Sequence, residues 1–244
     1  MKSFFKIILS VFILSFATAS FAETKDCFEK VNRTFFSFNK GLDKVIFKPI
    51  AKGYSYLPNI VKKGVRNVTS NINHTVTIPN HALQGNFKSF YNDTSRLIIN
   101  STVGLLGILD PASKLGFKKL EQEDYGQTLG FWGVGKGCYI MLPIFGPTTT
   151  RDFAGKIANT LLDPFYLTTV GDQTILDQNF GDSTFYVEKS FDTADFRSQN
   201  LKSFKTLEDN SLDLYSSVRS LYLQRRENLI SNSSSSEDEW KDFK

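Results

Sequence analysis

The stretch EDYGQTLGFWGVGKGCYIMLPIFGPTTTRD, residues 123–152, organises the interpretation of the whole chain. Glycines recur in it at steps of two to four, at Gly126, Gly130, Gly133, Gly135 and Gly137. A glycine inside a helix costs roughly 1 kcal/mol relative to alanine, so this spacing argues against a stable helix. Glycine also permits positive φ and close approach of another surface. The apolar run 139–145, closed by Gly146-Pro147, therefore predicts a glycine-hinged hairpin with an apolar tip, and Arg151-Asp152 begins a new element.

The first 22 residues have the pattern of a secretory signal peptide. Lys2 and Lys6 form a positive end, residues 7–16 an apolar core, and Ser20-Phe21-Ala22 a small-x-small cleavage site. We place the cut after Ala22, with a cut after Ala19 as the alternative. Removal of the two lysines lowers the net charge from +4 to +2. That balance, without a run of basic residues, gives no reason to expect a nucleic-acid partner.

The predicted mature chain has no run of 18 apolar residues, so no ordinary transmembrane helix is expected. Aromatic residues nevertheless make up 14% of the sequence, with 23 phenylalanines. Such a content fits a large hydrophobic core, and it also fits a protein that lies in a membrane interface. Composition alone leaves both interpretations open.

Apolar residues at three- and four-residue steps predict a mostly helical protein, and we assign the fold to the all-α class. Asp26 is the expected cap of the first helix, Pro49 its expected end, and Pro79 the centre of an expected turn. One domain, residues 23–230, is expected, followed by a disordered polar tail at 231–244. The expected helices cover residues 28–47, a segment beginning after Pro58, a short segment after Pro79, and residues 87–108, 152–166 and 189–226.

The residues that would carry covalent chemistry are missing from the sequence. No GxSxG, Walker or HExxH motif occurs, and the segment 133–137 lacks the strand and helix that flank a phosphate-binding loop. Acidic residues near turns, such as Asp110 and Asp124, are more often caps than general acids. His74 and His81 are separated by Pro79, so we expect neither a shared helix face nor a metal site. We therefore expect no enzyme and no cofactor.

A set of residues spread through the mature chain matches one known family. In the first half these are Asp26, Phe28-Glu29, Asn32-Arg33, Phe38-Asn39, Lys48-Pro49, Leu83-Gln84-Gly85, Asn100-Ser101-Thr102, Gly104, Gly107 and Asp110. The densest block and the C-terminal matches are residues 125–130 and 132–135, Leu142-Pro143, Gly146-Pro147, Arg151-Asp152, Asp213, Tyr215, Arg219, Tyr222 and Arg225-Arg226. With these residues the chain resembles the MlaA/VacJ family of the bacterial phospholipid-asymmetry system.

The resemblance implies a single-domain helical ring that lies in the membrane interface and encloses a central amphipathic channel. It implies an outer-membrane component, on the periplasmic face, that removes mislocalised phospholipids from the outer leaflet and passes them to a periplasmic carrier protein. A trimeric porin is an implied partner. The expected channel or gate residues are Phe38, Asn39, Gly133, Val134, Gly135 and Gly137. The alternative is a non-transport envelope protein, structural or virulence-associated.

The sequence departs from the family pattern in two ways. Many relatives are lipoproteins, whereas Thr24-Lys25-Asp26 before Cys27 does not form a lipobox. In addition, Cys27 and Cys138 both stand where the family usually has proline. An even number of cysteines in an exported protein favours a disulfide. The two parallel substitutions suggest that this disulfide joins Cys27 to Cys138, tying the N-terminus to the hairpin.

Overall fold

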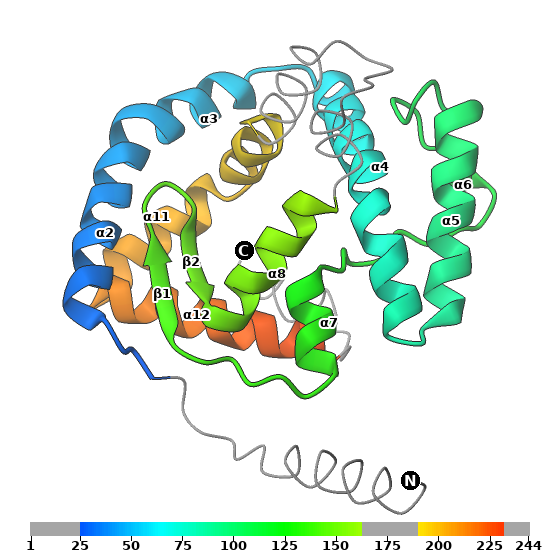
Figure 1. Cartoon of the computed structure of the whole chain (residues 1–244). Coiled ribbons are helices and arrows are strands. Elements are labelled where there is room, and N and C mark those ends of the chain that lie inside the picture. Colours follow the sequence, from blue (N-terminus) through cyan, green and yellow to red (C-terminus); the bar gives the residue numbers. More distant parts are fainter. Residues whose placement is uncertain (1–24, 163–189, 232–244) are drawn as a thin grey trace, which may run out of the picture.

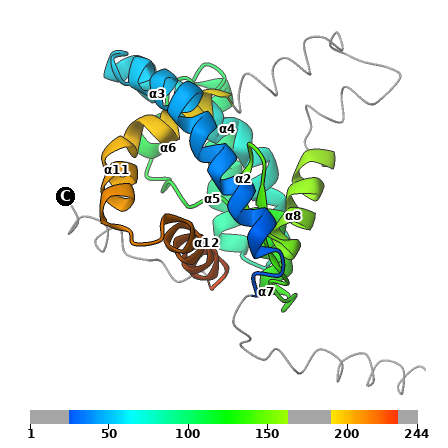
Figure 2. The ribbon, with the colours of Figure 1, turned by 90° about the vertical axis from the view of Figure 1, so that its left-hand side faces the viewer.

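The computed structural model describes residues 25–162 and 190–231 and shows a mostly helical single domain. The predicted signal peptide, the polar tail beyond residue 231 and the end of the helix expected over 152–166 lie outside the described residues. In Figure 1, the helices from α2 to α5 form an arc around a β-hairpin, α7 and α8. The view in Figure 2 places α8 on one side of α2, and α11 and α12 on the other.

The first helical segment runs beyond Pro49, so the predicted end there is wrong. It comprises α2 (Glu29–Leu42), a π-helical turn η1 (Asp43–Phe47) and α3 (Lys48–Ser55). A proline ring clashes with the carbonyl four residues earlier in a regular α-helix. Here the wider turn precedes Pro49, and the Lys48 N–H bonds to the Asp43 carbonyl. The expected Asp26 cap is also wrong, because α2 has no side-chain cap and Asp26 bonds to Asn32 instead.

Helix α4 (Asn59–Leu83) begins directly after Pro58, as predicted, but continues through Pro79. The turn predicted at Pro79 is therefore wrong. A proline inside a helix costs about 3 kcal/mol. Tertiary contacts offset that cost, because Thr77, Asn80 and His81 are all buried around the proline and α4 packs along α5.

Helix α5 (Phe87–Thr102) ends six residues before its predicted end at residue 108. The following residues form turns in which Leu105 and Leu106 have φ of 54° and 56°, and α6 (Pro111–Lys114) follows. Gly107 has φ of 92°, and a side chain there would come within 2.6 Å of Asn71 Cβ. The lack of a side chain at Gly107 therefore allows the turns after α5 to lie against α4. Asp110 caps α6 by accepting a bond from the Ser113 N–H, as predicted.

The opening stretch contains a helix, a hairpin and the start of another helix. Strands β1 (Tyr139–Leu142) and β2 (Gly146–Thr149) pair antiparallel, with Tyr139 opposite Thr149 and Leu142 opposite Gly146. This confirms the hairpin and makes the fold mostly helical rather than strictly all-α. Helix α8 (Thr150–Leu161) follows at once, which confirms the new element. The C-terminal part is helical over residues 190–199, in α11 (Leu201–Asn210) and in α12 (Leu214–Ile230).

Helix α7 (Tyr125–Phe131) contradicts the expectation that the glycine spacing excludes a helix. The glycines serve close packing instead. A Cβ on Gly155 of α8 would lie 2.2 Å from the Gly126 nitrogen, and one on Gly130 would lie 2.8 Å from Ile230 Cδ1. Contacts between α7, α8 and α12 therefore offset the helix penalty, and the spacing marks close helix packing.

Burial in this domain is inverted relative to an ordinary soluble protein. Among the described residues, six hydrophobic side chains are buried, against twenty polar or charged ones. Large apolar side chains are instead exposed, including Val45 at 73%, Ile60 at 81%, Leu106 at 78% and Phe145 at 76%. Lys, Glu, Arg and Asp are rarely buried unless paired. Within the described part of the chain, no helix is long and apolar enough to cross a membrane.

Candidate functional site in the hairpin and the polar interior

Two asparagines of α2 hold the first strand of the hairpin by its backbone. The Asn32 amide donates to the Tyr139 carbonyl at 3.1 Å and accepts from the Met141 N–H at 2.9 Å. Asn39 donates to the Leu142 carbonyl at 2.8 Å and accepts from the Ile144 N–H at 2.7 Å. Seven residues make two helical turns, so both amides lie on one face of α2. Asn39 was an expected site residue, whereas the spacing that also singles out Asn32 was overlooked.

The tip of the hairpin is apolar and exposed. Ile144, with φ of 68°, is 59% exposed, and Phe145 is 76% exposed. Phe38, the neighbour of Asn39 on α2, is 52% exposed. The asparagine therefore fixes the backbone of the tip while large apolar side chains remain at the surface.

The base of the hairpin is fixed by a covalent bond. The structure joins Cys27 and Cys138 in a disulfide, with their Cα atoms 5.6 Å apart. The Tyr139 N–H also bonds to the Lys25 carbonyl at 3.0 Å. Gly137, with φ of 69°, packs against Thr150, since a Cβ there would come within 2.9 Å of the threonine Cβ. The N-terminal segment and the start of α8 thus meet at this base.

The expected site residues form two separate groups. Phe38 and Asn39 lie beside the tip, whereas Gly133, Val134, Gly135 and Gly137 precede the base, at the other end of β1. In this loop Val134 is 39% exposed, and Lys136 Nζ contacts Glu227 Oε2 at 2.8 Å. The loop at 133–137 is itself bonded to α8, since the Arg151 N–H bonds to the Lys136 carbonyl at 3.3 Å.

We expect Gly133→Ala to destabilise the protein by about 1–2 kcal/mol, because Gly133 has φ of 87°, a conformation that costs L-residues about that much. The matched control is Gly135→Ala. Gly135 has no positive φ and open space where a Cβ would be, so its substitution should change the free energy of unfolding by less than about 0.5 kcal/mol. Urea denaturation measures both. Equal losses in the two variants would contradict this assignment.

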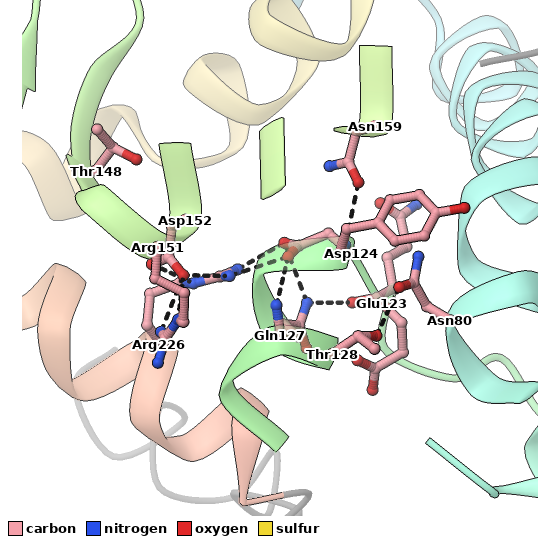
Figure 3. A network of polar contacts seen from close by, with 12 residues as sticks. Asn80, Glu123, Asp124, Gln127, Thr128, Thr148, Arg151, Asp152, Asn159 and Arg226 are labelled. Carbon is pink, nitrogen blue, oxygen red and sulfur yellow. Dashed lines mark hydrogen bonds and ion pairs between the residues drawn. The ribbon is translucent and has the colours of Figure 1, made fainter. Parts of the chain in front are cut away.

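An ion-pair network lies behind the hairpin, where α7, α8 and α12 meet (Figure 3). Arg226 Nη1 lies 2.6 Å from Asp124 Oδ2, and its Nε lies 3.0 Å from Asp152 Oδ2. Tyr222 donates to the same Asp152 oxygen at 2.6 Å. Burial alone would raise the pKa of Asp152, but Arg226 holds it below its usual value. Asp124 also accepts from the Gln127 N–H, which confirms its predicted role as a cap.

A second polar cluster joins α4 to α7. The Thr128 hydroxyl donates to Asn80 Oδ1 at 2.6 Å, and Gln84 Nε2 donates to Glu123 Oε2 at 2.9 Å. Burial raises the pKa of Glu123. These side chains lie in the interior, so the faces that join the helices here are polar.

His74 and His81 share a helix face, contrary to the expectation. His81 Nε2 lies 3.2 Å and His74 Nδ1 3.6 Å from Asp93 Oδ2. The continuation of α4 through Pro79 brings residues seven apart together, two turns along the helix. Over residues 25–162 and 190–231, no group of three potential ligands could hold a metal ion.

A further buried ion pair closes the turn after α5. Arg96 Nη2 lies 2.9 Å from Asp110 Oδ2, and Asp110 also accepts from the Ser113 hydroxyl and from Asn100. Burial alone would raise the pKa of Asp110, but these donors lower it to about 2.

We expect Asp110→Asn to lower the free energy of unfolding at pH 6, with the loss shrinking as the pH falls from 4 to 2. A carboxyl whose folded pKa is depressed stabilises the fold above its unfolded pKa of about 3.9, and that stabilisation is lost as pH falls toward the folded pKa. Urea denaturation across this range measures the effect. A difference between variant and parent that stays constant with pH would contradict it.

These features define a class: a mostly helical single domain with a polar, ion-paired interior, an apolar surface and a hairpin pinned to its first helix. Both cysteines are in the disulfide, so the described residues offer no free thiol. The model of the MlaA lipoprotein family matches residues 24–229. The chain belongs to this family.

Three similar proteins illustrate the match. An uncharacterized protein of Rickettsia bellii is 36% identical over 84% of this chain and 76% of its own length. The intermembrane phospholipid transport system lipoprotein MlaA of Haemophilus influenzae is 30% identical over 85% of this chain and 80% of its own. A solved structure described as "Structural basis for maintenance of bacterial outer membrane lipid asymmetry" superposes with a TM-score of 0.71 at 31% identity, covering 84% of this chain and 99% of that one.

Proposed function

We propose that this protein is the outer-membrane component of an intermembrane phospholipid transport system. It removes mislocalised phospholipids from the outer leaflet and passes them to a periplasmic carrier, which maintains lipid asymmetry. The observation that carries the proposal is the inverted burial, with charged and amide side chains inside and large apolar side chains exposed. An apolar exterior is stabilised by contact with acyl chains, and a polar interior accommodates a headgroup.

The proposed form is a ring in the membrane interface with an amphipathic channel through it. The arc of helices in Figure 1 supports this form. A protein that lies in the interface needs apolar surface without spanning helices, which agrees with the exposed residues and with the lack of spanning helices in the described part. The function is transport, so it requires no nucleophile, metal or cofactor.

The proposed gate consists of the exposed hairpin tip beside Phe38 and Asn39 and the glycine loop at 133–137. Replacing both Gly133 and Gly135 with bulkier residues should impair transport while the domain still folds. A Cβ at either glycine would meet open space, which supports the expectation that the double variant still folds. Unchanged lipid asymmetry in the double variant would remove the loop from the gate.

The proposed partners are a periplasmic lipid carrier and a trimeric porin, at the periplasmic face of the outer membrane. The family description is that of a lipoprotein, whereas no lipobox precedes Cys27 and the structure places that cysteine in the disulfide. We therefore propose that exposed apolar side chains and the porin hold the protein at the membrane. Extraction by carbonate with the native sequence, compared with a variant carrying an added lipobox, tests this anchoring.

The decisive test of the function is genetic. A strain lacking this gene should accumulate phospholipid in the outer leaflet and lose its barrier to detergent, and expression of the native chain should restore both. A deletion strain with a normal surface lipid profile would favour the non-transport envelope protein. Hydrolysis of phospholipid by the purified protein would favour an enzyme.

A further inference from the structure

The wide turn in the first helical segment is held by a contact from the C-terminal part of the chain. Turn η1 has no buried residue, so packing of its own side chains does not fix it. Its first residue, Asp43, accepts hydrogen bonds from Arg197 through both carboxylate oxygens, from Nε to Oδ1 and from Nη2 to Oδ2, each at 2.8 Å. A two-point contact of this kind fixes the orientation of the two groups as well as their distance.

Arg197 is itself held in place by its surroundings. It lies on the helical segment 190–199 and is 8% exposed. Its guanidinium lies over the Phe204 ring of α11, 4.4 Å from the ring centre, in a cation–π contact. Two residues earlier, the buried Asp195 accepts from Arg66 of α4 at 3.0 Å. The segment 190–199 therefore links η1 to α4 through two side chains.

The aspartate that Arg197 holds adjoins the residue that holds the hairpin tip. The Asp43 N–H bonds to the Asn39 carbonyl, one helical turn earlier. The Asn39 side chain donates to the Leu142 carbonyl at 2.8 Å and accepts from the Ile144 N–H at 2.7 Å. These bonds form a continuous path from Arg197 to the tip.

The rotation of α2 about its axis matters for this path. The Asn39 amide can bond to two backbone groups of the hairpin only when its face of α2 is turned toward them. The π-helical turn follows directly and departs from regular helical geometry, so a regular helix does not continue the face of α2. The carboxylate of Asp43, held at two points one turn after Asn39, therefore fixes the rotation where it is needed.

A neighbouring ion pair provides a contrast. Lys40 of α2 contacts Glu208 of α11 at 2.7 Å, but the two side chains are 53% and 43% exposed. Exposed ion pairs contribute little to stability, because water screens them and ordering two long side chains costs entropy. Of the two contacts that reach the end of α2 from this part of the chain, the buried Arg197 is thus better placed to fix the helix.

We propose that Arg197 is a positioning residue for the proposed gate. Through Asp43 it sets the rotation of α2, and this rotation holds Asn39 against the hairpin tip. Arg197 acts on the tip only through these two residues. The inference rests on the proposed function, because the gate is part of it, and it adds the residue that places the gate.

Amide hydrogen exchange of the full chain, resolved to single residues, tests the inference. Arg197→Gln should accelerate exchange of the Ile144 N–H about tenfold, as expected for the loss of one charge-assisted contact. The Met141 N–H bonds instead to Asn32, which Asp26 also holds, two turns earlier on α2. Its exchange should change by less than about twofold, because local opening at the tip does not release it.

Two further variants accompany this measurement. Arg197→Lys keeps the positive charge but not the two-point contact, so it should accelerate Ile144 exchange by less than Arg197→Gln does. It also leaves Asp43 with a cation, which guards against a glutamine variant that fails to fold. The matched control is Glu208→Gln, which removes the exposed ion pair of Lys40 and should leave Ile144 exchange within about twofold of the native rate.

Unchanged exchange of the Ile144 N–H in Arg197→Gln would overturn the inference. Equal acceleration at Ile144 and Met141 would indicate a general loss of stability and would overturn it as well. In a strain lacking the gene, Arg197→Gln should restore less lipid asymmetry than the native chain, and full restoration despite faster exchange would overturn the role in the gate. Failure of the native chain to restore asymmetry would instead refute the proposed function, whereas the exchange rates would still decide whether Arg197 positions the tip.

Discussion

Arg226→Leu should destabilise the protein by about 3–5 kcal/mol, the largest effect we expect from a single substitution. Removal of one partner from a buried ion pair leaves the other charge uncompensated, and losses of this size are typical. Here two carboxylates would lose their main partner, and the Asp152 side chain is only 2% exposed. Urea denaturation, read as the midpoint and slope, measures the change in the free energy of unfolding.

The neighbouring residue provides the control for this experiment. Arg225 is exposed, and the same substitution, Arg225→Leu, should change the free energy of unfolding by less than about 0.5 kcal/mol. A loss below about 1 kcal/mol for Arg226→Leu would show that the network contributes little. Adding Asp124→Asn to Arg226→Leu should recover part of the loss, because Asp124 then lacks the cation it contacts, whereas Asp152 keeps its ion pair with Arg151.

Removal of the disulfide should cost about 4–5 kcal/mol. Cys27 and Cys138 are 111 residues apart, and cross-linking a loop of that length lowers the entropy of the unfolded chain by an amount of this order. The double variant Cys27→Ser/Cys138→Ser should therefore unfold at a lower urea concentration than the oxidised protein. The Asn32 and Asn39 bonds remain, so the hairpin should stay folded on α2 at low denaturant.

The reduced native protein serves as the control, because it should match the serine variant in stability. Mass spectrometry of the unreduced protein should find no free thiol. Two free thiols in that measurement, or equal stability with and without reductant, would contradict the disulfide.

The sequence predicted those features that depend on neighbouring residues. Pro58 directly precedes α4, Asp110 and Asp124 cap the helices that follow them, and the apolar run before Gly146-Pro147 forms a hairpin, as the sequence predicts. The resemblance identified the family, which the match over residues 24–229 confirms. It also suggested the pairing of Cys27 with Cys138, which the structure joins.

The sequence-based predictions are wrong where contacts between residues far apart in the sequence outweigh the local helix propensity. Pro49 and Pro79 lie inside continuous helical segments, and Gly126 and Gly130 lie inside α7. Helix propensities differ by only about 1–3 kcal/mol even for these residues, so a few tertiary contacts reverse them. The glycine spacing was a real signal, but of close helix packing.

The sequence by itself determined most of the helices, the hairpin and the family, since caps, prolines and apolar periodicity act within a few residues. Only the tertiary structure decided which charges pair, because Arg226 lies 102 residues from Asp124 and 74 from Asp152. It also separated the predicted gate into two groups. Pairing between charges far apart in the sequence is set by how the helices pack, and no local pattern encodes it.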